Sequence, residues 1–79
     1  GEAMDKQIEL KRLIADYNTL VIRLNNAEKY FDKCTDKQYD SSLDLFKDLI
    51  KQASEIANRI ENFIGRPLTT YESLHGINI

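Results

Sequence analysis

The sequence contains almost none of the residues that build disulfides and metal sites. Cys34 is the only cysteine and His75 the only histidine among 79 residues, so an internal disulfide is impossible and no metal site is expected. A single unpaired thiol is typical of reducing compartments, which favours a cytoplasmic location. The three glycines, Gly1, Gly65 and Gly76, lie too far apart to form a phosphate-binding loop, and no cofactor is expected.

The sequence also lacks an excess of one charge and a long apolar run. The net charge is −2, and no segment is strongly basic, which disfavours binding to a nucleic-acid duplex through its phosphates. No apolar run approaches the roughly 18 residues of a membrane span, and no signal peptide is visible. Gly1, Glu2 and Ala3 precede Met4 and are interpreted as a cloning remnant, which leaves residues 4–79 as a single domain.

The first part of the chain has the apolar spacing of a long helix, from about Asp5 to about Asp32. Steps of three and four keep side chains on one face, as in helices that pack lengthwise against a partner. Ile14 and Val21 widen this apolar strip, whereas Ile22 falls on the far side and is expected to be exposed. The strip consists of Leu10, Leu13, Tyr17, Leu20, Leu24, Ala27 and Phe31.

A second helix is predicted from about Ser41 to Ile64, after a polar loop at residues 33–40. Asp40, Ser41 and Ser42 are good N-cap residues, and Gly65 can end the helix in a left-handed conformation. This helix carries two apolar strips, whereas a single partner needs only one. The first strip is Phe46, Leu49, Ala53, Ile56, Ile60 and Phe63; the second is Leu43, Phe46, Ile50, Ala53, Ala57, Ile60 and Ile64.

The tail, residues 66–79, contains a short helix signal. Thr69 with Glu72 has the spacing of a capping box, and Gly76 is a plausible stop, so a short helix is expected at about residues 70–75. Three outcomes remain open for the tail: it covers the second strip of the second helix, it contacts another subunit or partner, or it is disordered. Its apolar residues are Leu68, Tyr71, Leu74, Ile77 and Ile79.

These elements predict an all-α fold, an antiparallel two-helix hairpin with a short third helix or ordered tail. A chain of this length buries only about 60 % of its unfolded surface, and small domains often gain stability by associating. We therefore expect a homo-oligomer, most simply a dimer that forms a helical bundle, with a tail-covered monomer as the alternative. The expected contact is the part of the second strip formed by Leu43, Ile50, Ala57 and Ile64.

Residues with the chemistry of catalysis are few. Cys34 and His75 are a nucleophile and a base by type, but no third residue orients them. Asp44 and Asp48 are better explained as solvated carboxylates near the start of a helix, where negative charge is favoured. We therefore expect no enzymatic activity.

Two small groups of residues are candidates for contacts with a partner or ligand. Tyr30 and Tyr39 lie at the loop end of the hairpin, and tyrosine is enriched in interface hot spots. The second group combines basic, hydroxyl and aromatic side chains within ten residues, as a site for a phosphate-containing ligand would require. Its members are Arg66, Thr69, Thr70, Tyr71 and His75.

In size, acidity and hairpin pattern the chain resembles the small helical accessory proteins encoded by phages and mobile elements. Some of those proteins inhibit host enzymes, and others sequester signalling nucleotides. No motif connects the chain to one such family, so the resemblance carries over no functional residue. The expected function is that of a small non-catalytic adaptor or inhibitor that binds another protein. The alternative is an oligomer that sequesters a phosphate-containing ligand such as a nucleotide.

Overall fold

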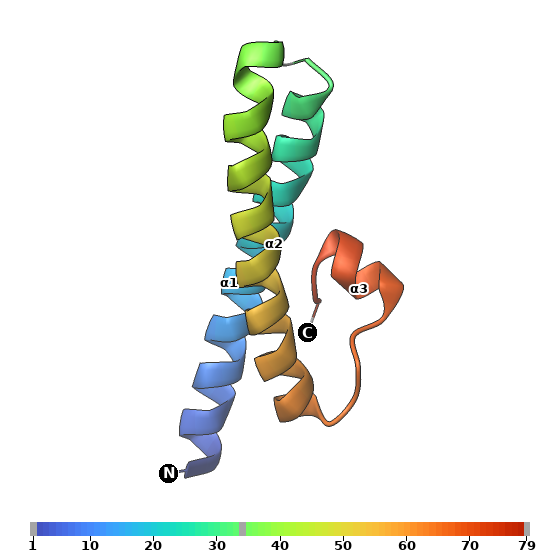
Figure 1. Cartoon of the computed structure of the whole chain (residues 1–79). Coiled ribbons are helices and arrows are strands. Elements are labelled where there is room, and N and C mark those ends of the chain that lie inside the picture. Colours follow the sequence, from blue (N-terminus) through green and yellow to red (C-terminus); the bar gives the residue numbers. More distant parts are fainter. Residues whose placement is uncertain (1, 34, 79) are drawn as a thin grey trace.

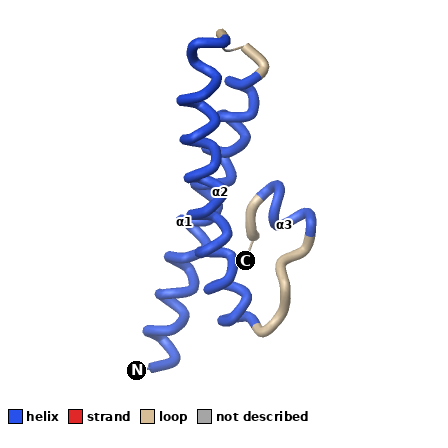
Figure 2. The backbone as a smooth tube through the Cα atoms, viewed as in Figure 1, coloured by secondary structure: helices blue, strands red, loops and turns tan. Residues whose placement is uncertain are grey.

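The computed structural model describes residues 2–33 and 35–78, together with the side chains of all of these except Glu2 and Ala3. Its elements are α1 (Glu2–Phe31), α2 (Asp36–Ile64) and α3 (Thr70–His75). α1 and α2 form a long antiparallel hairpin, and α3 lies beside it (Figures 1 and 2). The all-α prediction is confirmed. Cys34 and Ile79, used in the sequence analysis, lie outside the described residues.

The hairpin core is formed by the apolar strip predicted on the first helix. Leu13, Tyr17 and Leu20 are buried, and Leu10, Leu24 and Ala27 pack around them. From α2 the buried partners are Leu49, Ala53 and Ile60. Ile22 is exposed, as expected. The two helices cross and diverge toward the N-terminus of α1, which leaves Phe63 at the end of α2 partly exposed (Figure 1).

α2 begins at Asp36, five residues earlier than predicted. Thr35 precedes it in an extended conformation, and the Gln38 side chain accepts the Thr35 backbone N–H at 3.3 Å. This is half of a capping box, a signal that lies within the residues interpreted as loop. Ser41 and Ser42 therefore lie inside the helix and cap nothing. Tyr39 is likewise helical, because α2 begins at Asp36.

The end of α2 is where the sequence places it. Gly65 adopts the left-handed conformation with φ of 73°, and its N–H donates to the carbonyl of Glu61 at 2.8 Å. A side chain in this conformation would be strained, which explains why glycine stands here. The Glu61 carboxylate then accepts the backbone N–H of Leu68 at 2.8 Å, and this bond turns the tail back along the hairpin.

The tail packs back on its own chain, chiefly against α1, and Leu74 lies beside Ile50 of the second strip of α2. Ile77 is only 3 % exposed and joins the core cluster that contains Ile14 and Val21. Between these two residues, Asn18 binds the tail backbone through both ends of its amide. Its Oδ1 accepts the N–H of Ile77 at 2.7 Å, and its Nδ2 donates to the carbonyl of Ile77 at 2.9 Å. The Tyr17 hydroxyl donates to the carbonyl of Ser73 at 3.3 Å.

Gly76 allows the tail to approach Asn18 closely. Its φ is 96°, and a Cβ added here would lie 2.7 Å from Asn18 Oδ1. Both the backbone conformation and the lack of space therefore require glycine. The backbone of Gly76 and Ile77 is thus held against the side-chain amide of Asn18.

No helix within the described residues is long and apolar enough to cross a membrane. This agrees with the absence of a long apolar run in the sequence.

We predict that Asn18→Ala lowers the free energy of unfolding by about 1–3 kcal/mol, because it leaves two buried backbone groups of Ile77 without partners. Urea unfolding followed by circular dichroism measures this change. The matched control is Asn26→Ala, at an exposed position of the same helix, which is expected to be neutral or slightly stabilising. Equal losses in both variants would contradict the assigned role of Asn18.

Candidate functional site

The outer side of α3 presents aromatic and aliphatic side chains to solvent. Tyr71 is 70 % exposed and Leu74 is 58 % exposed. The rings of Tyr71 and His75 stack with their centroids 4.6 Å apart. Residues three and four apart share a helix face, so these three side chains form one continuous strip. We call Tyr71, Leu74 and His75 the α3 surface.

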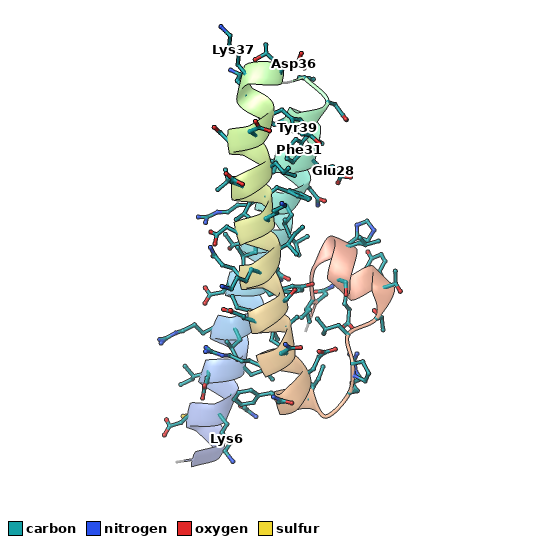
Figure 3. The ribbon with its side chains drawn as sticks, in the orientation of Figure 1. Lys6, Glu28, Phe31, Asp36, Lys37 and Tyr39 are labelled. Carbon is teal, nitrogen blue, oxygen red and sulfur yellow. The ribbon has the colours of Figure 1, made fainter. Side chains whose placement is uncertain are left out.

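The α3 surface continues into an open hollow between α1 and α2. Leu74 forms one wall of this hollow, and Leu24, Phe46 and Ile50 contribute apolar side chains from the two long helices. The hollow has a volume of about 180 Å³. Polar groups stand at its edge, among them Glu28, which lies on the same side of the hairpin as α3 (Figure 3). An apolar floor with a polar rim is the usual composition of a protein-binding surface.

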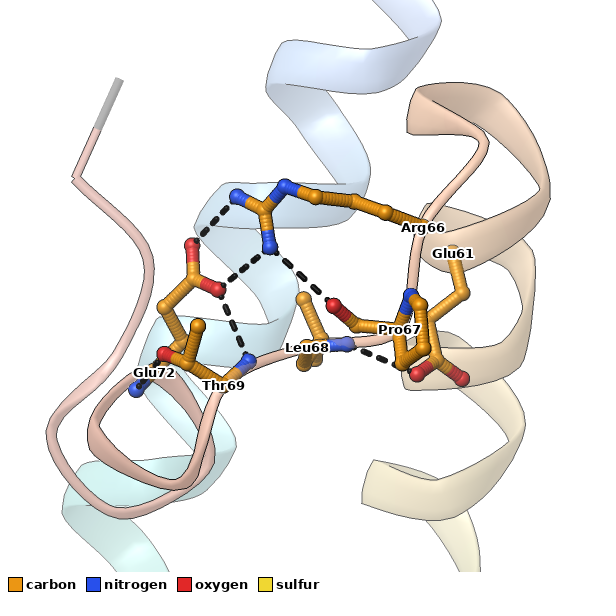
Figure 4. A network of polar contacts seen from close by, with 6 residues as sticks. All are labelled: Glu61, Arg66, Pro67, Leu68, Thr69 and Glu72. Atoms are coloured by element: carbon orange, nitrogen blue, oxygen red, sulfur yellow. Dashed lines mark hydrogen bonds and ion pairs between the residues drawn. The ribbon is translucent and has the colours of Figure 1, made fainter.

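A network of polar contacts holds α3 in place (Figure 4). Arg66 binds the Glu72 carboxylate through both of its terminal nitrogens, at 2.9 and 3.1 Å, and also donates to the carbonyl of Pro67. Thr69 and Glu72 form the predicted capping box: the Thr69 hydroxyl accepts the N–H of Glu72, and the Glu72 carboxylate accepts the N–H of Thr69. The start of α3 is therefore fixed by reciprocal side-chain and backbone bonds.

These contacts change the acidity of Glu72. The hydrogen bonds from Arg66, followed by the backbone N–H of Thr69, lower the pKa of Glu72 from 4.5 to about 2. Both donors favour the charged carboxylate over the neutral acid. Glu72 is therefore ionised in the folded protein at any physiological pH, and the ion pair with Arg66 persists.

The five residues predicted to hold a phosphate-containing ligand lie together along the chain but are engaged differently. Arg66 is occupied by Glu72, and the Thr69 hydroxyl caps α3. Thr70 is exposed, and Tyr71 and His75 stack on each other. A phosphate at this position would have to compete with the Glu72 carboxylate for the same guanidinium.

The two tyrosines predicted at the loop end lie in different surroundings. Tyr39 packs edge to face against Phe31, with ring centroids 5.6 Å apart, and Phe31 packs in turn against Phe46 at 5.3 Å. Phe31 and Tyr39 lie together next to the loop (Figure 3). Tyr30 borders a separate hollow with Ala27 and Leu45. Tyr39 therefore belongs to an aromatic cluster at the loop end of the hairpin, and both Tyr39 and Tyr30 remain partly exposed.

The four residues predicted to contact a second subunit do not form one free strip. Ala57 and Ile64 pack against the core of their own chain, and Leu43 is half-buried. Ile50 is more exposed and lines the hollow beside Leu74. Much of this side of α2 is thus used within the monomer, and the predicted contact remains a prediction.

Groups suited to acid–base chemistry or metal binding are not gathered in the described part of the chain. Residues 2–33 and 35–78 contain no cluster of three or more His, Cys, Asp or Glu side chains able to hold a metal ion. The shifted pKa of Glu72 has a structural explanation in the anchoring of α3.

Two residues important for this surface were not singled out from the sequence. Leu74 was expected to dock with the rest of the tail, but Leu68 and Ile77 pack inward while Leu74 faces solvent. Its spacing of three from Tyr71 was an available signal. Asn18 was passed over because a polar residue interrupts an apolar strip, although its place between Ile14 and Val21 marks it as facing the same side.

We predict that Glu72→Gln lowers the melting temperature at neutral pH and that the difference from the parent chain disappears in acid. Glu72 has a lower pKa folded than unfolded, so its contribution is present above about pH 4.5 and is lost as the pH falls through about 2. Thermal unfolding across this range measures the effect. Glu55→Gln, on the exposed side of α2, is the control. A Glu72→Gln difference that persists below about pH 2 would rule out this ion pair as its source.

Comparison of the chain with protein-family models, curated proteins and solved structures finds no match. The function of this hairpin therefore has to be inferred from its own residues and their arrangement.

Proposed function

We propose that this chain is a small non-catalytic adaptor or inhibitor, acting in the cytoplasm, that binds another protein through the α3 surface. The observation that carries the proposal is the exposure of Tyr71 and Leu74 on a helix that is itself firmly attached. Short helices that serve only to cover a core turn their large apolar residues inward. In α3 no residue is buried, and its two largest side chains point outward.

The attachment of α3 makes these side chains effective anchors. Tyrosine is enriched among residues that dominate binding energy, and its two side-chain torsions cost little entropy when they are fixed. The stacking on His75 restrains Tyr71 before any partner arrives. Arg66 binds the side chain of Glu72 in the first turn of α3, and Asn18 binds the backbone of Ile77 after the end of α3. Preorganisation of this kind improves affinity, because the side chains and backbone lose less conformational entropy on binding.

The chemistry of the expected partner follows from the hollow next to Leu74. Its apolar floor suits a single aliphatic or aromatic side chain, and its small volume suits one anchor and not a whole helix. Glu28 at the edge favours a partner with a basic or amide group near that anchor. A protein surface with an apolar residue flanked by Lys, Arg or Asn fits this description.

We predict that Tyr71→Ser and Leu74→Ser each abolish capture of a specific protein from an extract of the cells in which the gene resides. Loss of one buried anchor typically weakens an interface by about 2 kcal/mol or more. Affinity capture with the immobilised full chain, read by mass spectrometry, measures it. Ile22→Ser, at an equally exposed position on α1, is the control and should retain the protein. Retention by all three variants would exclude the α3 surface as the contact.

Sequestration of a nucleotide is the competing function, and a melting experiment separates the two. A ligand that binds only the native state at 100 times its dissociation constant stabilises it by about 2.7 kcal/mol. We predict that mono-, di- and cyclic nucleotides leave the melting temperature unchanged, because Glu72 occupies Arg66. A rise that is lost in Arg66→Gln would instead support a phosphate site and overturn the protein-binding proposal.

A further inference from the structure

A row of separate hollows lies along the side of the hairpin that the tail does not cover. Helical periodicity places Asp16, Thr19 and Arg23 on the flank of α1 opposite to Asn18 and Val21. Three successive hollows lie along this flank, and α1 and α2 alone line them. In Figures 1 and 2 α3 occupies one side of the pair only. We call the opposite side the tail-free groove.

The lining of the tail-free groove is mostly apolar toward its two ends and mixed in the middle. Leu13 and Phe63 contribute apolar surface where the helices diverge. In the middle, Leu20 and Ile56 lie among polar and charged side chains. At the loop end, Leu45 is 59 % exposed beside Ala27 and Tyr30. Tyr30, Leu45 and Phe63 are thus exposed apolar side chains that line this groove, and exposed apolar surface of this kind marks an interaction site.

We propose that the occupant of this groove is a second copy of the same chain, so that two hairpins form a four-helix core with the tails on its outer sides. A two-fold interface pairs a surface with itself, and one contact then covers both open grooves at once. This inference does not depend on the binding role proposed for the α3 surface, which lies on the other flank.

The area of the groove agrees with this occupant. Its lining runs from Lys6 to Tyr30 along α1, which at about 1.5 Å per residue is roughly 36 Å. Two helices side by side, each about 10 Å across, make a surface on the order of 700 Å². A stable dimer of standard size buries about 800 Å² on each partner.

The charges at the groove edges also agree with self-pairing. A surface that pairs with itself needs both signs, because one sign alone would meet its own kind across the two-fold axis. The edges carry four basic and three acidic side chains, which are close to balanced. These are Lys6, Arg12, Arg23 and Arg59 against Asp5, Glu9 and Asp16.

The test is the solution mass of the full chain across a concentration series, measured by sedimentation for the parent and three variants. Leu45→Glu places a charge in the groove of both protomers and is expected to weaken the dimer by about a hundredfold or more. Ile22→Glu and Leu74→Glu introduce the same charge at similarly exposed positions outside the groove and should leave the mass unchanged. Circular dichroism confirms that each variant retains its helices.

A second measurement does not rely on variants. In a mixture of isotope-labelled and unlabelled chains, nuclear Overhauser contacts between copies should involve Leu45, Ile56 and Phe63. A monomer at high micromolar concentration overturns the proposal. A dimer that Leu45→Glu leaves intact, or contacts between copies that map to Ile22 or Leu74, overturns it as well.

Discussion

The packing of α1 against α2 is the interaction on which the rest of the molecule depends. This contact buries one apolar strip along each helix. Because two packed helices cover only the surfaces that face each other, the hairpin by itself leaves a flank open on each side. The short tail is long enough to cover part of one flank, and it does so through Ile77 and Asn18. The uncovered flank and the outer side of α3 are the two surfaces for which we propose binding.

The features that could be predicted from the sequence are those encoded by near neighbours. Leu13, Tyr17 and Leu20 follow a helical spacing, and their burial confirms that the spacing identified the core. Gly65 ends α2, and Thr69 with Glu72 starts α3, because each signal operates within a few residues. Side-chain and backbone chemistry over such short distances depends little on the rest of the fold.

The features that were missed depend on long-range contacts or on competing local signals. The start of α2 was misplaced because Asp40, Ser41 and Ser42 look like caps, while the pairing of Gln38 with Thr35 is equally local and was passed over. The contact made by the tail was left open, because apolar spacing does not say which apolar strip the tail will meet. The amide of Asn18 decides the matter, 59 positions away from Ile77. The ion pair that engages Arg66 joins it to Glu72 only six positions away, and it was missed because Glu72 was considered only as part of the capping box.

The bond from Leu68 to Glu61 has a consequence for competition between binding partners. This bond directs the tail back toward α1 at the point where the tail leaves α2. Ile77 therefore reaches Asn18 of its own chain. For α1 the tail is a tethered ligand, and short tethers correspond to effective concentrations of the order of millimolar. A free partner that binds the flank of α1 around Ile14 and Val21 would have to compete with the tail at this effective concentration. No segment among the described residues is tethered over the opposite groove, so the second copy of the chain that we propose there meets no such competition.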